Sequence, residues 1–308
     1  MSRRFWSAAA AAVTGVQVGS AMVATRFVAD QTGPASLALL RYVIGVCCLM
    51  PPMLLARHRV RFAARDLAPI ALLGITQFGI LIALLNYGLR SIPSARAALI
   101  FATFPLLTSL VAAALGRERL TSSKLAGVLL TILGVGLALG DKTLQPGVGD
   151  GGWLGELAVF ASASSGAVCS VLYRPYLEKY PTLPVSAFAM LASVAFLALL
   201  AAGEGFFASP PDLTPSGWLA VAFIGLSSGG GYYLWLWALN HATPTQVTVF
   251  LALSPVTAAG LGAWLLAEPV SPLLAVGLIS VVGGLALAHR RSREDRGIPL
   301  DSERGRAL

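Results

Sequence analysis

The sequence predicts an all-α polytopic membrane protein with ten transmembrane helices, arranged as two inverted five-helix repeats. Three observations lead to this prediction: the apolar composition, a series of apolar segments of membrane-spanning length, and an internal repeat. Of the 308 residues, 56% are hydrophobic and only 12% are charged, and the mean hydropathy is +0.76. A soluble domain of this size could not keep so much apolar surface out of water, so the solvent around most of the chain must be lipid.

Ten segments have the length and composition of a membrane-spanning helix, for which about 20 apolar residues are needed. Turn-forming stretches such as Gln31-Thr32-Gly33-Pro34 and Ser209-Pro210-Pro211 separate them. The first segment imitates a secretory signal, but the later segments favour an uncleaved first membrane helix. The predicted spans are 7–29, 34–56, 66–89, 94–115, 122–140, 152–173, 184–203, 216–239, 244–266 and 270–289.

Basic residues are concentrated at alternate ends of these spans. Because cytoplasmic loops carry the excess of arginine and lysine, this distribution predicts that both termini are cytoplasmic. The net charge of +8 is explained by membrane orientation, and no nucleic-acid partner is expected. The three cysteines, Cys47, Cys48 and Cys169, fall inside apolar spans, so no disulfide, metal site or cofactor is predicted.

The two halves of the chain carry identical residues 150 positions apart. The most informative pairs are Pro105 and Pro255, Glu118 and Glu268, and Gly134 and Gly284. A repeat with an odd number of spans must re-enter the membrane upside down, and such inverted repeats underlie alternating access around a midplane site. The predicted organisation is a first repeat at 1–140, an external linker at 141–151, a second repeat at 152–289 and a cytoplasmic basic tail at 290–308.

Short motifs in both halves resemble the drug/metabolite transporter superfamily, in its ten-span EamA branch. They are Arg41-Tyr42, Tyr87-Gly88-Leu89, Phe104-Pro105, Gly116-Arg117-Glu118-Arg119-Leu120-Thr121, Gly134-Val135-Gly136, Trp237-Ala238-Leu239, Ser254-Pro255, Ala267-Glu268-Pro269 and Gly283-Gly284. The resemblance covers residues 1–289 and implies a bacterial inner-membrane transporter. Members of the superfamily carry amino acids, other metabolites, nucleotide sugars or drugs. The chain departs from the family pattern at Val16-Gln17-Val18-Gly19-Ser20, where a tryptophan-glycine signature is common.

Polar side chains near the membrane midplane mark a candidate binding site. Gln17 lies in the middle of the first span and Gln77 in the middle of the third, and neither could satisfy its hydrogen bonds against lipid. We expect both to line a cavity and bind polar groups of a small-molecule substrate. Ser164 and Ser228 lie at similar depth in the sixth and eighth spans, although helix-to-helix hydrogen bonds also explain buried serines.

Aromatic and charged side chains complete the predicted site. Phe78 and Phe101 lie at cavity depth and are candidates for contact with an apolar part of the substrate, with core or lipid packing as the alternative. Arg41 lies roughly 10 Å inside the bilayer, where an unpaired charge is unfavourable. It either has a structural partner, such as a backbone carbonyl, Asp30 or Glu156, or it lines an external vestibule and draws a substrate carboxylate outward.

Two prolines at matching depth suggest that the helices can bend. Pro105 and Pro255 fall at the centres of the fourth and ninth spans, and Gly229 and Gly230 similarly weaken the eighth. Tolerated kinks are the alternative, but the recurrence at one depth favours paired hinges. No Asp or Glu lies at the centre of a span, which favours facilitated transport over proton coupling.

Together these features predict a transporter that exports small metabolites, amino acids first among them, by alternating access. A multidrug or nucleotide-derivative transporter of the same fold is the main alternative, followed by a channel or a membrane-embedded lipid-modifying enzyme. An enzyme is not expected, because the histidines and scattered acids form no catalytic cluster. The glycine-rich stretch at 147–152 lacks the Gly-Lys-Ser/Thr ending of a phosphate-binding loop. The exact substrate, the coupling and the oligomeric state are not specified by the sequence.

Overall fold

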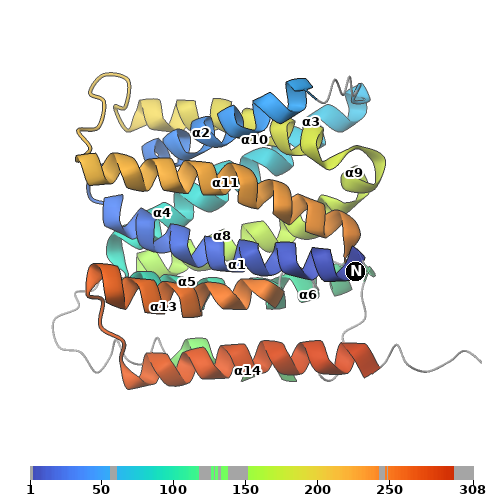
Figure 1. Ribbon diagram of the computed structural model, residues 1–308, viewed down its shortest axis with the longest axis vertical. Helices are drawn as coiled ribbons and strands as arrows, with labels where there is room; N and C mark the ends of the chain where they lie inside the picture. The colour runs from blue at the N-terminus through green and yellow to red at the C-terminus, as the bar shows by residue number, and fades with distance from the viewer. Residues whose placement is uncertain are drawn as a thin grey trace, which may run out of the picture.

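The computed structural model describes residues 3–55, 61–117, 126–127, 129–130, 133–137, 152–242, 247 and 249–294. Within these ranges every regular element is helical, and the helices lie side by side along one common direction (Figure 1). Seven helical stretches are long and apolar enough to cross a membrane, and two shorter apolar helices, Leu253–Leu266 and Pro272–Gly284, accompany them. The predicted linker at 141–151 lies outside the described residues.

The first half begins with two long helices and continues with two interrupted spans. A π-helical segment, η1, lies at the middle of the third span, and the fourth span is broken at Ala102 and Thr103. The fifth span is described only in short pieces between 126 and 137. The elements are α1 (Arg3–Val28), α2 (Pro34–Leu55), α3 (Ala64–Gly74), η1 (Ile75–Ile80), α4 (Leu81–Ser91), α5 (Ser94–Phe101) and α6 (Phe104–Ala114).

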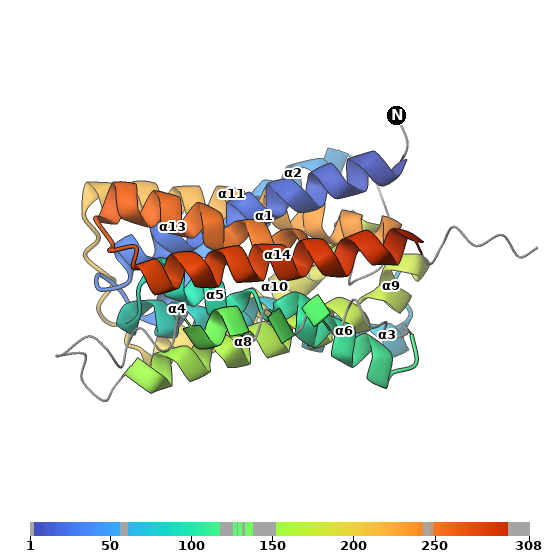
Figure 2. The ribbon, with the colours of Figure 1, turned by 90° about the horizontal axis from the view of Figure 1, so that it is seen from below.

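The second half repeats this order with different interruptions. Its eighth span is one unbroken helix, and in its ninth span a 3-10 turn, η2, directly precedes α13. The last helix, α14, lies at the lower edge of the bundle in Figure 1 and in front of the other helices in Figure 2, and it continues beyond the predicted end at 289 as far as Glu294. The elements are α8 (Gly152–Leu172), α9 (Arg174–Lys179), α10 (Thr182–Gly203), α11 (Pro215–His241), η2 (Val249–Ala252), α13 (Leu253–Leu266) and α14 (Pro272–Glu294).

The first helices of the two halves run in opposite directions. Near the end of α1, Arg26 donates hydrogen bonds to the carbonyl of Leu89 at the end of α4. Near the start of α8, Gly155 packs against Ser91, also at the end of α4. Helix α1 therefore ends at the face of the bundle where α8 begins. We call this the distal face, and the face where α1 begins the proximal face.

Two sets of helices pack tightly within themselves, and each draws on both halves of the chain. In the α1 set, α1 packs on α11 and α13, and α11 packs on α2. In the α8 set, α8 packs on α4, α5 and α6, while α10 packs on α3 and η1. The internal repeat relates the two sets, because each span of one set has its repeat-equivalent span in the other. The most extensive contacts between the sets are those of α2 with α10 and of α5 with α13.

Glycines allow the closest helix contacts. A Cβ atom on Gly15 would lie 2.1 Å from the carbonyl oxygen of Phe250, and one on Gly19 would lie 2.4 Å from that of Ser254. Helix α1 can therefore approach η2 and α13 only because both positions lack side chains. The glycines of the fifth and tenth spans, Gly134 and Gly277, also pack on each other within this chain.

Candidate substrate-binding cavity

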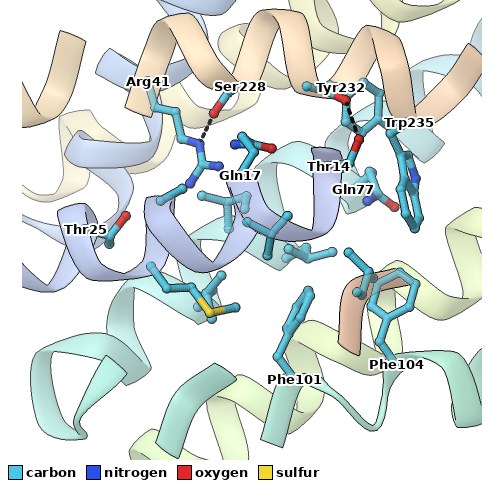
Figure 3. Close-up of a pocket in the computed structure, with 18 of the residues that line it drawn as sticks. Thr14, Gln17, Thr25, Arg41, Gln77, Phe101, Phe104, Ser228, Tyr232 and Trp235 are labelled. Atoms are coloured by element: carbon cyan, nitrogen blue, oxygen red, sulfur yellow. Dashed lines mark hydrogen bonds between the residues drawn. The ribbon is translucent and has the colours of Figure 1, made fainter. Parts of the chain in front are cut away.

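A cavity of about 80 Å³, measured as the space open to the centres of water-sized spheres, lies between the two helix sets. Its wall is mostly apolar, with a few polar groups that converge on it (Figure 3). Such walls are typical of sites that bind small molecules. The lining residues are Thr14, Gln17, Val18, Ala21, Met22, Thr25, Arg41, Tyr42, Gln77, Leu81, Ile82, Leu85, Phe101, Phe104, Ser228, Gly231, Tyr232, Trp235 and Leu251.

Arg41 supplies the charge of this cavity. Its side chain projects from α2 and is only 7% exposed. Its Cζ atom lies 5.6 Å from the ring centroid of Tyr42. Neither acid that the sequence suggested as a partner reaches it, because Asp30 lies 3.9 Å from Arg26 and Glu156 lies 3.8 Å from Arg96. Among the described residues, Arg41 thus forms no ion pair.

Ser228 on α11 positions Arg41. The Ser228 hydroxyl donates to the carbonyl of Ile224 at 2.5 Å and accepts a hydrogen bond from Arg41 Nε at 2.6 Å. Because the hydroxyl hydrogen is used within α11, its oxygen lone pairs are turned toward the guanidinium. The two terminal nitrogens of Arg41 have no hydrogen-bond partner among the described residues, so they are available to an anion in the cavity.

Gln77 lies in the π-helical segment η1. Its side chain is 8% exposed, and its Oε1 atom has no hydrogen-bond partner among the residues that the structure describes. π-Helical segments interrupt regular helices at many functional sites, and here the segment includes the residue that lines the cavity. A buried amide oxygen without a partner is unfavourable, so this atom favours a ligand that donates a hydrogen bond.

The side chain of Gln17, on α1, contacts helix α11. Its Nε2 atom donates to Ser227 Oγ at 3.3 Å, and Ser227 is the residue that the repeat aligns with Gln77. A Cβ atom on Gly231 would lie 2.5 Å from Gln17 Oε1, so the glycine makes room for the amide. Gln17 therefore both lines the cavity and joins α1 to α11.

One end of the cavity is aromatic. The ring centroids of Phe101 and Phe104 are 5.4 Å apart, and Phe104 meets Trp235 edge to face at 6.0 Å. Trp235 is 4% exposed, so its ring is buried in the wall of the cavity. The spacing of Ser228, Gly231 and Trp235 at i, i+3 and i+7 on α11 is the signal that could have identified this cavity-facing stripe.

Two predicted site residues do not reach the cavity. Phe78 is fully buried behind the wall, where its ring packs against Tyr42 at 5.0 Å and Tyr232 at 3.9 Å between centroids. It supports two lining residues instead of touching the space itself. Ser164 lies away from the cavity, and its hydroxyl donates to the carbonyl of Phe160 one turn back in α8 at 2.9 Å. This local bond satisfies the hydroxyl without a ligand.

The two predicted hinge prolines lie beside interruptions of their spans, whereas the two predicted hinge glycines lie within a continuous helix. Pro105 is the second residue of α6, directly after the break in the fourth span, and Pro255 is the third residue of α13, after η2. Both spans are thus interrupted beside their prolines. In contrast, α11 runs unbroken through Gly229 and Gly230. A Cβ atom on Gly229 would lie 2.9 Å from the carbonyl oxygen of Gly45, so Gly229 allows close packing of α11 on α2.

Helical bundles with a cavity between their repeat-related helices are common among membrane transporters. Comparison with known proteins identifies the family: the EamA-like transporter family matches residues 5–140 and again residues 153–290, and the chain belongs to it. This confirms the resemblance to the drug/metabolite transporter superfamily and the prediction of a transporter fold.

Several relatives and one solved structure resemble the chain over most of its length. A "Probable terminal-alkyne amino-acid exporter" of Streptantibioticus cattleyicolor is 31% identical over 301 residues, which cover 95% of both chains. The "Aromatic amino acid exporter YddG" of Ancylobacter novellus is 30% identical over 219 residues, covering 67% of this chain and 70% of its own. One crystal structure superposes with a TM-score of 0.71 at 26% identity and covers 94% of this chain and 98% of that one.

Proposed function

We propose that this protein exports amino acids across the bacterial inner membrane, with both of its termini in the cytoplasm, and that Arg41 binds the substrate carboxylate. The observation that carries the proposal is the buried guanidinium of Arg41, which forms no ion pair with any described residue. Removing a charge from water is unfavourable unless an opposite charge or hydrogen-bond partners replace the water. A substrate carboxylate meets this need at the two free terminal nitrogens.

The rest of the cavity suits the other parts of a zwitterion. The unpartnered Oε1 of Gln77 accepts a hydrogen bond from an ammonium group, and the aromatic end accepts an apolar side chain. Seven residues of α11 separate Ser228, beside the carboxylate position, from Trp235 at the aromatic end, which corresponds to about 10 Å along the helix. This length fits amino acids with large apolar side chains, and it agrees with the names of the relatives described above.

The arrangement of the helices supports alternating access. Two sets that the inverted repeat exchanges enclose the cavity, so a rocking motion of one set against the other would open it to each face in turn. Pro105 and Pro255 would allow the broken fourth and ninth spans to bend during this motion. The described lining contains no Asp or Glu to carry a coupled proton. We therefore propose facilitated export down the substrate gradient.

Purified protein in liposomes, assayed with a panel of labelled amino acids, tests the proposal. We expect saturable flux and counterflow for zwitterions with large apolar side chains, such as leucine, phenylalanine and tryptophan. Lysine should be a poor substrate, because its side-chain ammonium would enter the apolar, aromatic end of the cavity, where the described lining holds no acid to pair with it. Absence of flux for every amino acid would contradict amino-acid export, and flux without saturation or counterflow would indicate a channel.

A further inference from the structure

Three charged side chains at the distal face reach from one helix set to a helix terminus of the other. Arg26 of the α1 set donates from Nη1 to the carbonyls of Leu89 and Arg90, at the end of α4, at 3.1 Å each. Carbonyls in the last turn of a helix lack a donor within the helix and carry partial negative charge, which a guanidinium complements.

The second contact is made by Glu204, directly after α10 of the α8 set. Its carboxylate accepts hydrogen bonds from the backbone N–H groups of Ala35 at 2.9 Å and Ser36 at 2.8 Å, and from Ser36 Oγ at 2.7 Å. These groups belong to the first turn of α2. The carboxylate therefore satisfies N–H groups that the helix itself leaves free.

The third contact is made by Glu268, two residues after the end of α13 in the α1 set. Its oxygens accept from the backbone N–H of Ser94 at 3.0 and 3.1 Å and from Ser94 Oγ at 2.5 Å. Ser94 is the first residue of α5 in the α8 set. Gly262 makes room for this contact, since a Cβ atom there would lie 2.6 Å from Glu268 Oε2.

These contacts lie next to the cavity on its distal side. Arg26 follows Thr25, a lining residue of α1, and Leu89 lies one turn beyond Leu85, a lining residue of α4. The Arg26 contact thus joins two opposite walls just beyond the cavity. The Glu204 and Glu268 contacts join the sets at two further places, where α2 packs on α10 and where α5 packs on α13.

The proximal face has a different pattern in the part of the chain that is described. There, Asp66 on α3 contacts Lys179 and accepts a hydrogen bond from the hydroxyl of Tyr180 at 2.6 Å, while Arg117 donates to the carbonyl of Val171 at 2.5 Å. Both contacts join elements of the α8 set to each other or to α9. Charged contacts between the sets are therefore concentrated at the distal face.

We propose that Arg26, Glu204 and Glu268 are the latches of an external gate, and that the gate opens when all three release together. This inference depends on the proposed function for the external position of the distal face. Because each latch joins one set to the other, a rocking motion that opens the distal face must break them. When they are closed they stabilise the state in which the cavity is sealed from the outside.

Cysteine labelling tests the latches without any substrate. Cys47, Cys48 and Cys169 are first replaced by alanine, Thr25 is replaced by cysteine, and right-side-out vesicles are treated with a membrane-impermeant maleimide. We expect slow labelling in this background, and labelling about five-fold to thirty-fold faster when Glu204→Gln and Glu268→Gln are added, because each neutral amide weakens a charge-assisted contact. Glu178→Gln is the matched control, because this exposed acid pairs only with Arg174, four residues earlier.

An unchanged labelling rate in the double variant would overturn the proposal, as would acceleration seen only in inside-out vesicles. Both readouts are independent of amino-acid flux. Failure of the substrate panel, in turn, would leave the labelling result intact, so the two proposals fail separately.

A reversible cross-link gives a second measurement that does not depend on weakening a contact. A Cβ atom on Gly262 would lie 2.7 Å from Ser94 Oγ, close enough for a disulfide with little backbone movement. In the cysteine-free background, Ser94→Cys and Gly262→Cys are combined with Glu268→Ala, which clears the space between them. With Thr25→Cys also present, we expect oxidation to slow maleimide labelling at position 25 in right-side-out vesicles and a reductant to restore it. Unchanged labelling in completely oxidised protein would overturn the gate.

Discussion

Arg41 on α2 and Ser228 on α11 are joined by a hydrogen bond of 2.6 Å between Nε and Oγ, inside a cavity that belongs to neither helix alone. The bond uses the one guanidinium nitrogen that lies nearest the aliphatic stem of Arg41. It leaves the planar pair of terminal nitrogens for bidentate contact with a carboxylate. This relationship makes the proposed substrate site testable residue by residue.

Replacing Arg41 with glutamine should weaken substrate binding more than any other single change in the cavity. We expect KM for transported amino acids to rise by about ten-fold to a hundred-fold, because hydrogen bonds to charged groups contribute about 1.5–3 kcal/mol. Arg41→Lys should be intermediate, since it keeps the charge and loses the planar fork. Flux in proteoliposomes measures the effect. Arg174→Gln, at an exposed ion pair outside the cavity, is the control and should leave KM unchanged.

Ser228 is expected to act through Arg41. Ser228→Ala should raise KM by a smaller factor, about five-fold, and Ser228→Thr should restore it because the hydroxyl returns. In the double variant with Arg41→Gln, removing Ser228 should add nothing further, since its partner is already gone. An additive loss in the double variant would mean that Ser228 touches the substrate itself.

Substitution of Gln77 should affect the stability of the protein and its transport activity in different ways. Gln77→Leu removes a buried amide oxygen that has no partner, so we expect the melting temperature of the detergent-solubilised protein to stay equal or rise. The same change should lower flux, because the substrate ammonium loses its acceptor. Gln77→Glu is the informative companion: its carboxylate keeps an acceptor for the substrate ammonium, so flux should exceed that of Gln77→Leu. A loss of flux together with a loss of stability would point to a structural role instead.

Close packing of α1 makes a prediction about folding alone. Gly19→Ala places a Cβ atom 2.4 Å from the carbonyl oxygen of Ser254, so α1 and α13 must separate. We expect a destabilisation of about 1–3 kcal/mol, the usual effect of overpacking, measured by thermal unfolding. Gly260→Ala is the matched control, because no atom lies within 4 Å of a Cβ atom there. Equal melting temperatures for the two variants would contradict the packing argument.

Several features were predictable from the sequence because they depend on composition and chain order. Apolar segments of membrane length can only be helices when lipid surrounds them, since each backbone group must be bonded within its own segment. The pairing of Pro105 with Pro255 and of Glu118 with Glu268 revealed the repeat. Gln17 and Gln77 were identifiable as lining residues because an amide in the bilayer must face protein or water.

The orientation of each helix about its own axis was decided by the tertiary structure. Ser164 and Ser228 are equivalent by depth, yet only Ser228 faces the cavity; Phe78 is hidden while Trp235 is not. A helix that is apolar on every side carries no amphipathic signal, so its sequence does not tell which face turns inward. The face that turns inward is fixed by close contacts between helices, such as that of Gly19 with Ser254. The same packing places Arg41 beside Ser228 and leaves it without an acidic partner among the described residues.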